Sequence, residues 1–235
     1  DDMRRDYAEL RFSPRPRSIR AIRKVGFEPA FEYITDSTGL LETRQAQFSV
    51  RFEFENGDRW NTTYEDTFER LDEEFDIADD VIVPVGDYGF RTVRTNYRLG
   101  PQRKVSGGLT FQHGGFFGGD RTDARYEGRV EVTPQLSVEP NLSWSWVDLP
   151  QGSFTTRLVG VRTNVTVSPR TLIGALVQYN SSDDSVSANV RFRWEYQPGS
   201  DLFLVYSEGR DTARPRFPLL TNRSVILKFT RLFRF

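Results

Sequence analysis

The sequence predicts an all-β fold, an antiparallel up-and-down transmembrane β-barrel. The clearest evidence is segment 223–235, RSVILKFTRLFRF, in which apolar and polar residues alternate with the period of a strand. It ends on a phenylalanine, and we expect lipid to cover its apolar side. About twelve segments alternate in this way, most of roughly 9–13 residues, which is the length a tilted strand needs to cross a bilayer.

The composition excludes several classes of protein. No run of eighteen apolar residues occurs, so a helical membrane span is excluded, whereas a barrel exposes only alternate residues to lipid. With no cysteine and one histidine, we predict no disulfide, no cofactor and no metal site built on cysteine. We also predict no enzyme, although hydrolysis by a serine or an acid pair stays open. The net charge of −1 favours no nucleic-acid partner.

Two regions are predicted. Residues 1–18 contain a partial strand and a turn and are interpreted as the remnant of an upstream region, because the start lacks the apolar core of a signal peptide. Residues 19–235 form the barrel domain. Pro29 lies on an apolar face and is expected to mark a bulge or bend. The predicted strands are 19–33, 45–55, 60–68, 90–99, 105–111, 123–133, 136–146, 155–167, 173–179, 186–196, 202–208 and 223–235. Thirteen or fourteen strands, or only the C-terminal part of a larger barrel, are the alternatives.

The connections alternate in length, which favours a membrane barrel over a soluble meander. Short turns lie at 56–57, 100–101, 134, 169 and 198–199. Longer or more polar loops lie at 35–41, 71–87, 114–121, 148–153, 180–185 and 209–222. Short periplasmic turns at one rim and extracellular loops at the other are typical of outer-membrane barrels.

Aromatic residues of the apolar face gather near strand ends, as in the girdles of membrane barrels. The set near the short turns is Phe54, Trp60, Tyr97, Trp194, Tyr196 and Phe235. The set near the long loops is Tyr33, Trp144, Trp146 and Tyr179. The charged exceptions on this face are also near strand ends, where arginine reaches lipid headgroups: Arg23, Arg91, Arg157 and Arg231. Asp66 also interrupts the apolar face.

Several segments resemble one uncharacterised bacterial family. They are GGFFGGDRT (114–122), VDLPQGSFTT (147–156), ALVQYNSSDDS (175–185), YQPGSDLFLVYSEGRDT (196–212) and LKFTRLFRF (227–235). In that family a carbohydrate-binding family 9-like module precedes a C-terminal outer-membrane β-barrel. The resemblance covers most of 19–235 and implies an outer-membrane location but no known reaction. The chain lacks the module, so sugar binding does not carry over to it.

Charged residues on the polar faces are the main candidate site. They are Arg20, Lys24, Glu28, Glu32, Arg51, Glu53, Glu55, Glu65, Arg94, Arg98, Arg125, Glu127, Arg129, Glu131, Arg191, Arg193, Glu195, Lys228 and Arg234. They either line a water-filled pore or form cross-strand ion pairs that fill and stiffen the interior.

Other candidates are weaker. Asp72, Asp76, Asp79 and Asp80 in the acidic loop offer the oxygen ligands that Ca²⁺ takes, but their spacing matches no calcium loop, and solvated surface charge is favoured. The glycine-rich segment 114–119 is interpreted as a flexible tip. His113 lacks the paired groups that catalysis needs.

We therefore expect a channel or transport component in the outer membrane of a Gram-negative-type bacterium. Its expected partners are the lipid bilayer, the barrel-assembly machinery and saccharides held by the missing module. Phe229, Phe233 and Phe235 are the expected C-terminal insertion signal. The alternatives are a non-conducting membrane anchor for that module and a soluble all-β binding domain.

Overall fold

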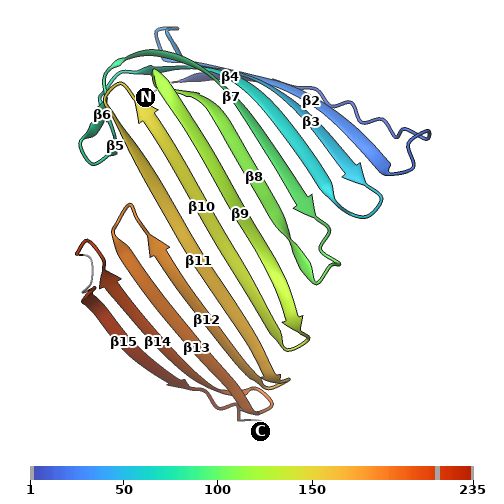
Figure 1. The fold of residues 1–235 in the computed structure, drawn as a ribbon, viewed down its shortest axis with the longest axis vertical. Coiled ribbons are helices and arrows are strands. Elements are labelled where there is room, and N and C mark those ends of the chain that lie inside the picture. The colour runs from blue at the N-terminus through green and yellow to red at the C-terminus, as the bar shows by residue number, and fades with distance from the viewer. Residues whose placement is uncertain (1–2, 215–217, 234–235) are drawn as a thin grey trace. The chain divides into compact units, whose positions relative to one another are not determined.

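A computed structural model describes residues 3–214 and 218–233 of the chain and confirms the antiparallel up-and-down all-β fold (Figure 1). Thirteen strands form one sheet in the order β1-β2-β3-β4-β7-β8-β9-β10-β11-β12-β13-β14-β15, and β5 and β6 form a separate two-stranded sheet. No helix in the described ranges is long and apolar enough to cross a membrane.

Most strands extend further than the alternation alone predicts. Their bounds are β1 Arg4–Glu9, β2 Ile22–Thr35, β3 Leu41–Phe54, β4 Arg59–Leu71, β5 Phe75–Ala78, β6 Val81–Val83, β7 Gly86–Leu99, β8 Val105–Phe116, β9 Gly119–Thr133, β10 Leu136–Leu149, β11 Gly152–Ser168, β12 Thr171–Asn180, β13 Ser185–Gln197, β14 Ser200–Asp211 and β15 Leu219–Phe229.

The chain divides into two compact units, which are described separately. Unit 1 contains the described residues of 1–103, 107–125 and 144–155. Unit 2 contains those of 104–106, 126–143 and 156–235.

Strand β1 belongs to the sheet of unit 1, where it pairs with β2 from Arg4↔Thr35 to Glu9↔Ala30. It ends beside Pro29, whose carbonyl accepts the N–H of Leu10 at 3.0 Å but which has no N–H to return. The register of β2 with β3 runs unbroken through Pro29↔Phe48. The bulge predicted at Pro29 is therefore wrong, because the missing donor faces the end of β1 and not the ladder with β3.

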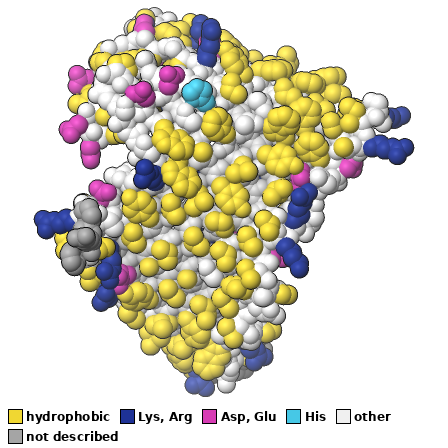
Figure 2. All heavy atoms as spheres, in the orientation of Figure 1, with side chains coloured by type: hydrophobic (Ala, Val, Ile, Leu, Met, Phe, Trp, Pro, Cys, Tyr) yellow, Lys and Arg dark blue, Asp and Glu magenta, His cyan; other side chains and the backbone are white. Residues whose placement is uncertain are grey.

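Part of the sheet in unit 1 has the opposite exposure to that of a water-soluble domain. On β3, the side chain of Ser49 is on a covered face (4 % exposed), whereas its neighbour Phe48 is 45 % exposed. In unit 2, Val177, Val190 and Leu204 are likewise exposed. Figure 2 shows a face on which hydrophobic side chains predominate over the strands and charged ones lie mainly toward the margins.

The apolar core lies at the long-loop end of unit 1. Its buried residues come from three separate segments and are Val81, Val83, Phe117, Val147 and Leu149. The predicted loop 71–87 thus contains the β5–β6 hairpin, whose β6 side chains at Val81 and Val83 join this core. Phe117 stands in the glycine-rich segment and packs edge-on to Tyr88 at 5.2 Å, so that segment is a packed hairpin tip.

Candidate functional site

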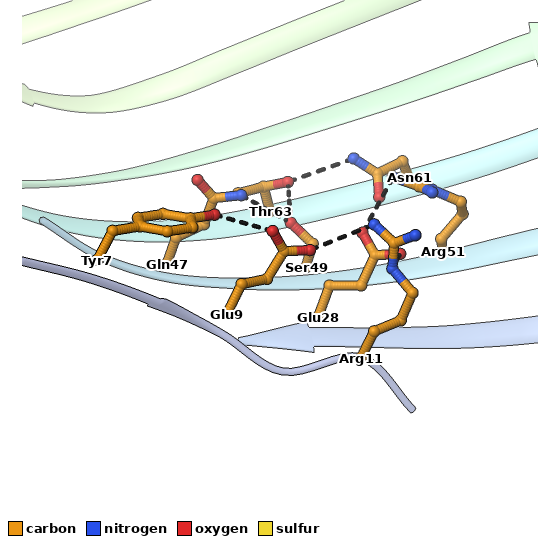
Figure 3. A network of polar contacts seen from close by, with 9 residues as sticks. All are labelled: Tyr7, Glu9, Arg11, Glu28, Gln47, Ser49, Arg51, Asn61 and Thr63. Carbon is orange, nitrogen blue, oxygen red and sulfur yellow. Dashed lines mark hydrogen bonds and ion pairs between the residues drawn. The ribbon is translucent and has the colours of Figure 1, made fainter. Parts of the chain in front are cut away.

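The candidate site is a network of polar side chains on the polar face of β1–β4 (Figure 3). Arg11, just beyond β1, donates to Glu9 at 3.2 Å and pairs with Glu28 at 3.0 Å. Arg51 of β3 donates to the other oxygen of Glu28 at 3.1 Å. The Tyr7 hydroxyl donates to Glu9 at 2.9 Å. Period-two alternation places these side chains on one face, and the register of neighbouring strands brings them into contact.

A second row of the network carries hydroxyl and amide groups. Gln47 donates to Ser49 at 3.1 Å, Ser49 and Thr63 share a hydrogen bond of 2.8 Å, and Asn61 donates to Thr63 at 3.3 Å. The Asn61 side-chain oxygen is buried and has no hydrogen-bond partner within the described part of the chain. A buried acceptor of this kind favours a donor from water or from a ligand.

An open cavity of about 180 Å³ adjoins the network. Its lining combines one phenol, two amides and three carboxylates with two apolar side chains: Tyr7, Glu9, Glu28, Ala30, Phe31, Glu32, Gln45 and Gln47. Each carboxylate has an arginine partner: Arg11 for Glu9, Arg11 and Arg51 for Glu28, and Arg5 for Glu32. Because these charges are compensated, the cavity suits a neutral ligand rich in hydroxyl groups better than an ion.

The structure places several of the predicted polar-face charges beside polar side chains of the same face. In unit 1, Lys24 lies opposite Glu53, Glu65 accepts from Thr67 at 3.2 Å, and Arg94 donates to Gln112 at 2.7 Å. Arg98 follows Arg94 on the same face of β7, and Arg125 is exposed on β9. Arg20 and Glu55 lie outside the strands, because β2 begins at Ile22 and β3 ends at Phe54.

In unit 2 the same pattern recurs. Arg193 pairs with Asp201 at 3.0 Å, Arg191 donates to Asn189 at 3.0 Å, and Glu195 accepts the Gly199 N–H. On β9, Arg129 pairs with Glu131 at 3.3 Å, and Glu127 precedes them on the same side of the strand. Lys228 lies opposite Phe203. Arg234 lies outside the described residues.

The predicted aromatic residues near the short turns form one cluster in each unit. In unit 1, the ring centroids of Phe54 and Tyr97 are 6.4 Å apart, and Trp60 stacks on Phe52 with ring centroids 5.5 Å apart. In unit 2, Tyr196 lies 6.1 Å from Trp194 and stacks on Phe229 at 5.2 Å. Phe235 lies outside the described residues, and Phe233 is exposed beyond the end of β15.

The aromatic residues predicted near the long loops lie on strands. Tyr33 is opposite Arg44, and Tyr179 is opposite Val186. Trp144 and Trp146 share one side of β10, where Trp146 is exposed.

The charges on the apolar face occupy distinct positions. Arg91 pairs with Asp66 at 2.8 Å, and Arg44 approaches the same carboxylate at 3.6 Å. Arg23 lies at the irregularity between Ile22 and Lys24 in the pairing of β2 with β3. The backbone N–H of Arg157 donates to Ser181, and the Arg231 guanidinium lies over the ring of Phe233 beyond β15.

The remaining candidates are His113 and the acidic loop. His113 Nδ1 lies 2.8 Å from the Thr122 hydroxyl. Across the described ranges no group of three or more histidine, cysteine, aspartate or glutamate residues could hold a metal ion, so Asp72, Asp76, Asp79 and Asp80 are not gathered. Asp76 lies within β5, and Asp79 and Asp80 form the turn into β6.

The sequence analysis missed one structured site, the turn at Asp58. Its carboxylate is buried and accepts hydrogen bonds from Gly100 N–H at 2.8 Å, Tyr97 OH at 2.8 Å and Arg103 at 3.0 Å. The Asn-Gly-Asp sequence indicates a hairpin, but the contact with 97–103 depends on register.

Comparison with known proteins adds no relative: no protein-family model matches the chain, and no curated protein matches it.

Proposed function

We propose that this chain forms part of the wall of an outer-membrane β-barrel. Its covered polar face lines a passage for small neutral solutes that are rich in hydroxyl groups and belong to the saccharide class. The single observation that carries the proposal is the reversed exposure of neighbouring side chains, as at Phe48 and Ser49. An apolar exposed face opposite a polar interior is the arrangement that lipid stabilises.

The polar network supports the choice of solute. Its carboxylates are charge-compensated by arginine, and its amide and hydroxyl groups offer both donors and acceptors.

A non-conducting anchor is the second candidate, and the β5–β6 hairpin favours it. Phe90 shares the polar face with Thr67, to which it is paired, and this end of the face packs against Val81 and Val83. In this alternative the hairpin closes the long-loop end of the passage.

The test uses the purified whole chain. Detergent-dependent solubility and a heat-dependent shift in gel mobility are expected of a membrane barrel, and stability as a monomer without detergent would contradict the proposal. In planar bilayers we expect conductance that sucrose reduces. Gln47→Leu should weaken this reduction, whereas Gln135→Leu, in an exposed turn, should not. Insertion without conductance would favour the anchor.

A further inference from the structure

Two clusters of charged side chains lie on the outward, mainly apolar face of the sheet. In unit 1, Asp66 on β4 lies between Arg91 on β7, at 2.8 Å, and Arg44 on β3, at 3.6 Å. All three share the outward side of the sheet, because Asp66 is paired with Ala46 and Arg91.

Unit 2 repeats this arrangement with different strands. Glu208 on β14 accepts from Arg210 at 2.5 Å and pairs with Arg223 on β15 at 2.9 Å, and it also accepts from the Tyr206 hydroxyl. Glu208 is paired with Ala188 and Arg223, on the same outward side as Val190 and Leu204. On the outward face, an acid between two arginines therefore occurs in each unit.

Both clusters lie toward the long-loop ends of their strands, where charged and apolar residues mix on the outward face: Phe68 lies beyond Asp66 on β4, and Val186 is paired with Arg210. Asp66 follows Tyr64 on β4, and Arg91 precedes Val93 on β7. In unit 2, Glu208 follows Tyr206 on β14, and Arg223 precedes Val225 on β15. In a bilayer these positions lie at the headgroup level.

Each cluster carries one net positive charge, and its arginines have unused donors. A guanidinium has five N–H groups, and the acid occupies only one edge of it. The Arg91 side chain is 74 % exposed. The central acid holds the two arginine side chains next to each other and orients them outward. Arginine binds phosphate oxygens in a bidentate geometry.

We propose that Arg44–Asp66–Arg91 and Arg210–Glu208–Arg223 bind the phosphate groups of anionic lipid headgroups in the leaflet at the long-loop rim. This inference rests on the proposed residence in a membrane. The competing explanation is that each cluster is only an internal ion pair.

The test measures lipid preference around the whole chain in phosphatidylcholine vesicles. Spin-labelled phosphatidic acid and spin-labelled phosphatidylcholine are compared by the fraction of label that contacts protein. We expect phosphatidic acid to be preferred roughly threefold to fivefold, with a decrease at high salt. Arg44→Gln with Arg91→Gln should lower the preference, and adding Arg210→Gln with Arg223→Gln should abolish it. The matched control, Arg94→Gln with Arg191→Gln on the polar face, should leave it unchanged.

Asp66→Asn separates the two explanations. Headgroup binding predicts that the preference for phosphatidic acid is kept or increased, since the net charge of the cluster rises. A purely internal ion pair predicts lower stability with no change in lipid preference. A chain that inserts into vesicles but contacts both lipids equally would overturn this inference alone. A chain that does not float with the vesicles would overturn the proposed function.

Discussion

The carboxylate of Asp58 lies 3.0 Å from the guanidinium of Arg103, and this contact joins two successive short turns of unit 1. Asp58 is 2 % exposed and also accepts the Tyr97 hydroxyl and the Gly100 N–H. Gln102 donates in addition to the Asn56 carbonyl at 2.5 Å. The aromatic cluster of Trp60 and Tyr97 is thereby held beside the turns.

Asp58→Ala should destabilise unit 1 by roughly 1–3 kcal/mol, because it leaves the buried Gly100 N–H without a partner and removes the acceptor of Tyr97 and Arg103. The free energy of unfolding is measured by urea titration of the detergent-solubilised chain, with loss of the heat-dependent gel shift as the signal of unfolding. Glu55→Ala, an exposed position in the same turn, is the control and should have little effect. Equal effects of the two substitutions would contradict the role of Asp58.

The pKa of Asp58 predicts how this stability depends on pH. Burial alone would raise the pKa, but hydrogen bonds from Gly100 and Tyr97 and the charge of Arg103 outweigh it, so the pKa lies below its usual value. A lowered pKa in the folded state gives stability that is present above the ordinary value of about 3.9 and is lost as the pH falls through the folded pKa.

The difference in unfolding free energy between the wild type and Asp58→Asn, measured from pH 7 to pH 2, isolates this contribution. It should be constant above about pH 5 and shrink toward lower pH. A difference that grew on acidification would show the opposite sign of shift. Arg103→Gln should move the decrease to higher pH.

Val83 anchors the β5–β6 hairpin to the apolar core and is fully buried. Val83→Ala should cost roughly 1–3 kcal/mol and expose the acidic segment between β4 and β6 to protease. Ile82→Ala is the matched control, since Ile82 alternates with Val83 and is 46 % exposed. Limited proteolysis of the folded chain compares the two. The same rate of cleavage in both variants would mean that the hairpin does not depend on this packing.

Gly114 allows β8 to approach the backbone of β7. A Cβ at this position would lie 2.1 Å from the Arg91 carbonyl oxygen, which is backbone and cannot rotate away. Gly114→Ala should therefore destabilise unit 1 by at least roughly 2 kcal/mol. At Gly89 a Cβ meets nothing within 4 Å, so Gly89→Ala is the control. Chemical denaturation of both variants in detergent provides the measurement, and similar midpoints would argue against this close contact.

Most strands could be predicted from the sequence because the alternation of apolar and polar residues is a local property. Residues such as Phe48 and Ser49 lie on opposite faces of any strand that contains them, whatever pairs with it. Sequence reasoning failed at Pro29, where the expected bulge depends on which neighbouring strand the missing N–H faces. It also predicted a loop at 71–87, because β5 and β6 are only four and three residues long and most acids of this segment lie around them.

The sequence by itself determined that the chain is all-β, which residues share a face and where most turns lie, since each follows from neighbours along the chain. Only the tertiary structure decided which charges meet. Asp66 interrupts an apolar face in the sequence, yet register sets it between Arg44 and Arg91. The core at Val83 likewise needs Phe117 and Leu149 from distant segments. Contacts across strands depend on register, and register is a property of the assembled sheet.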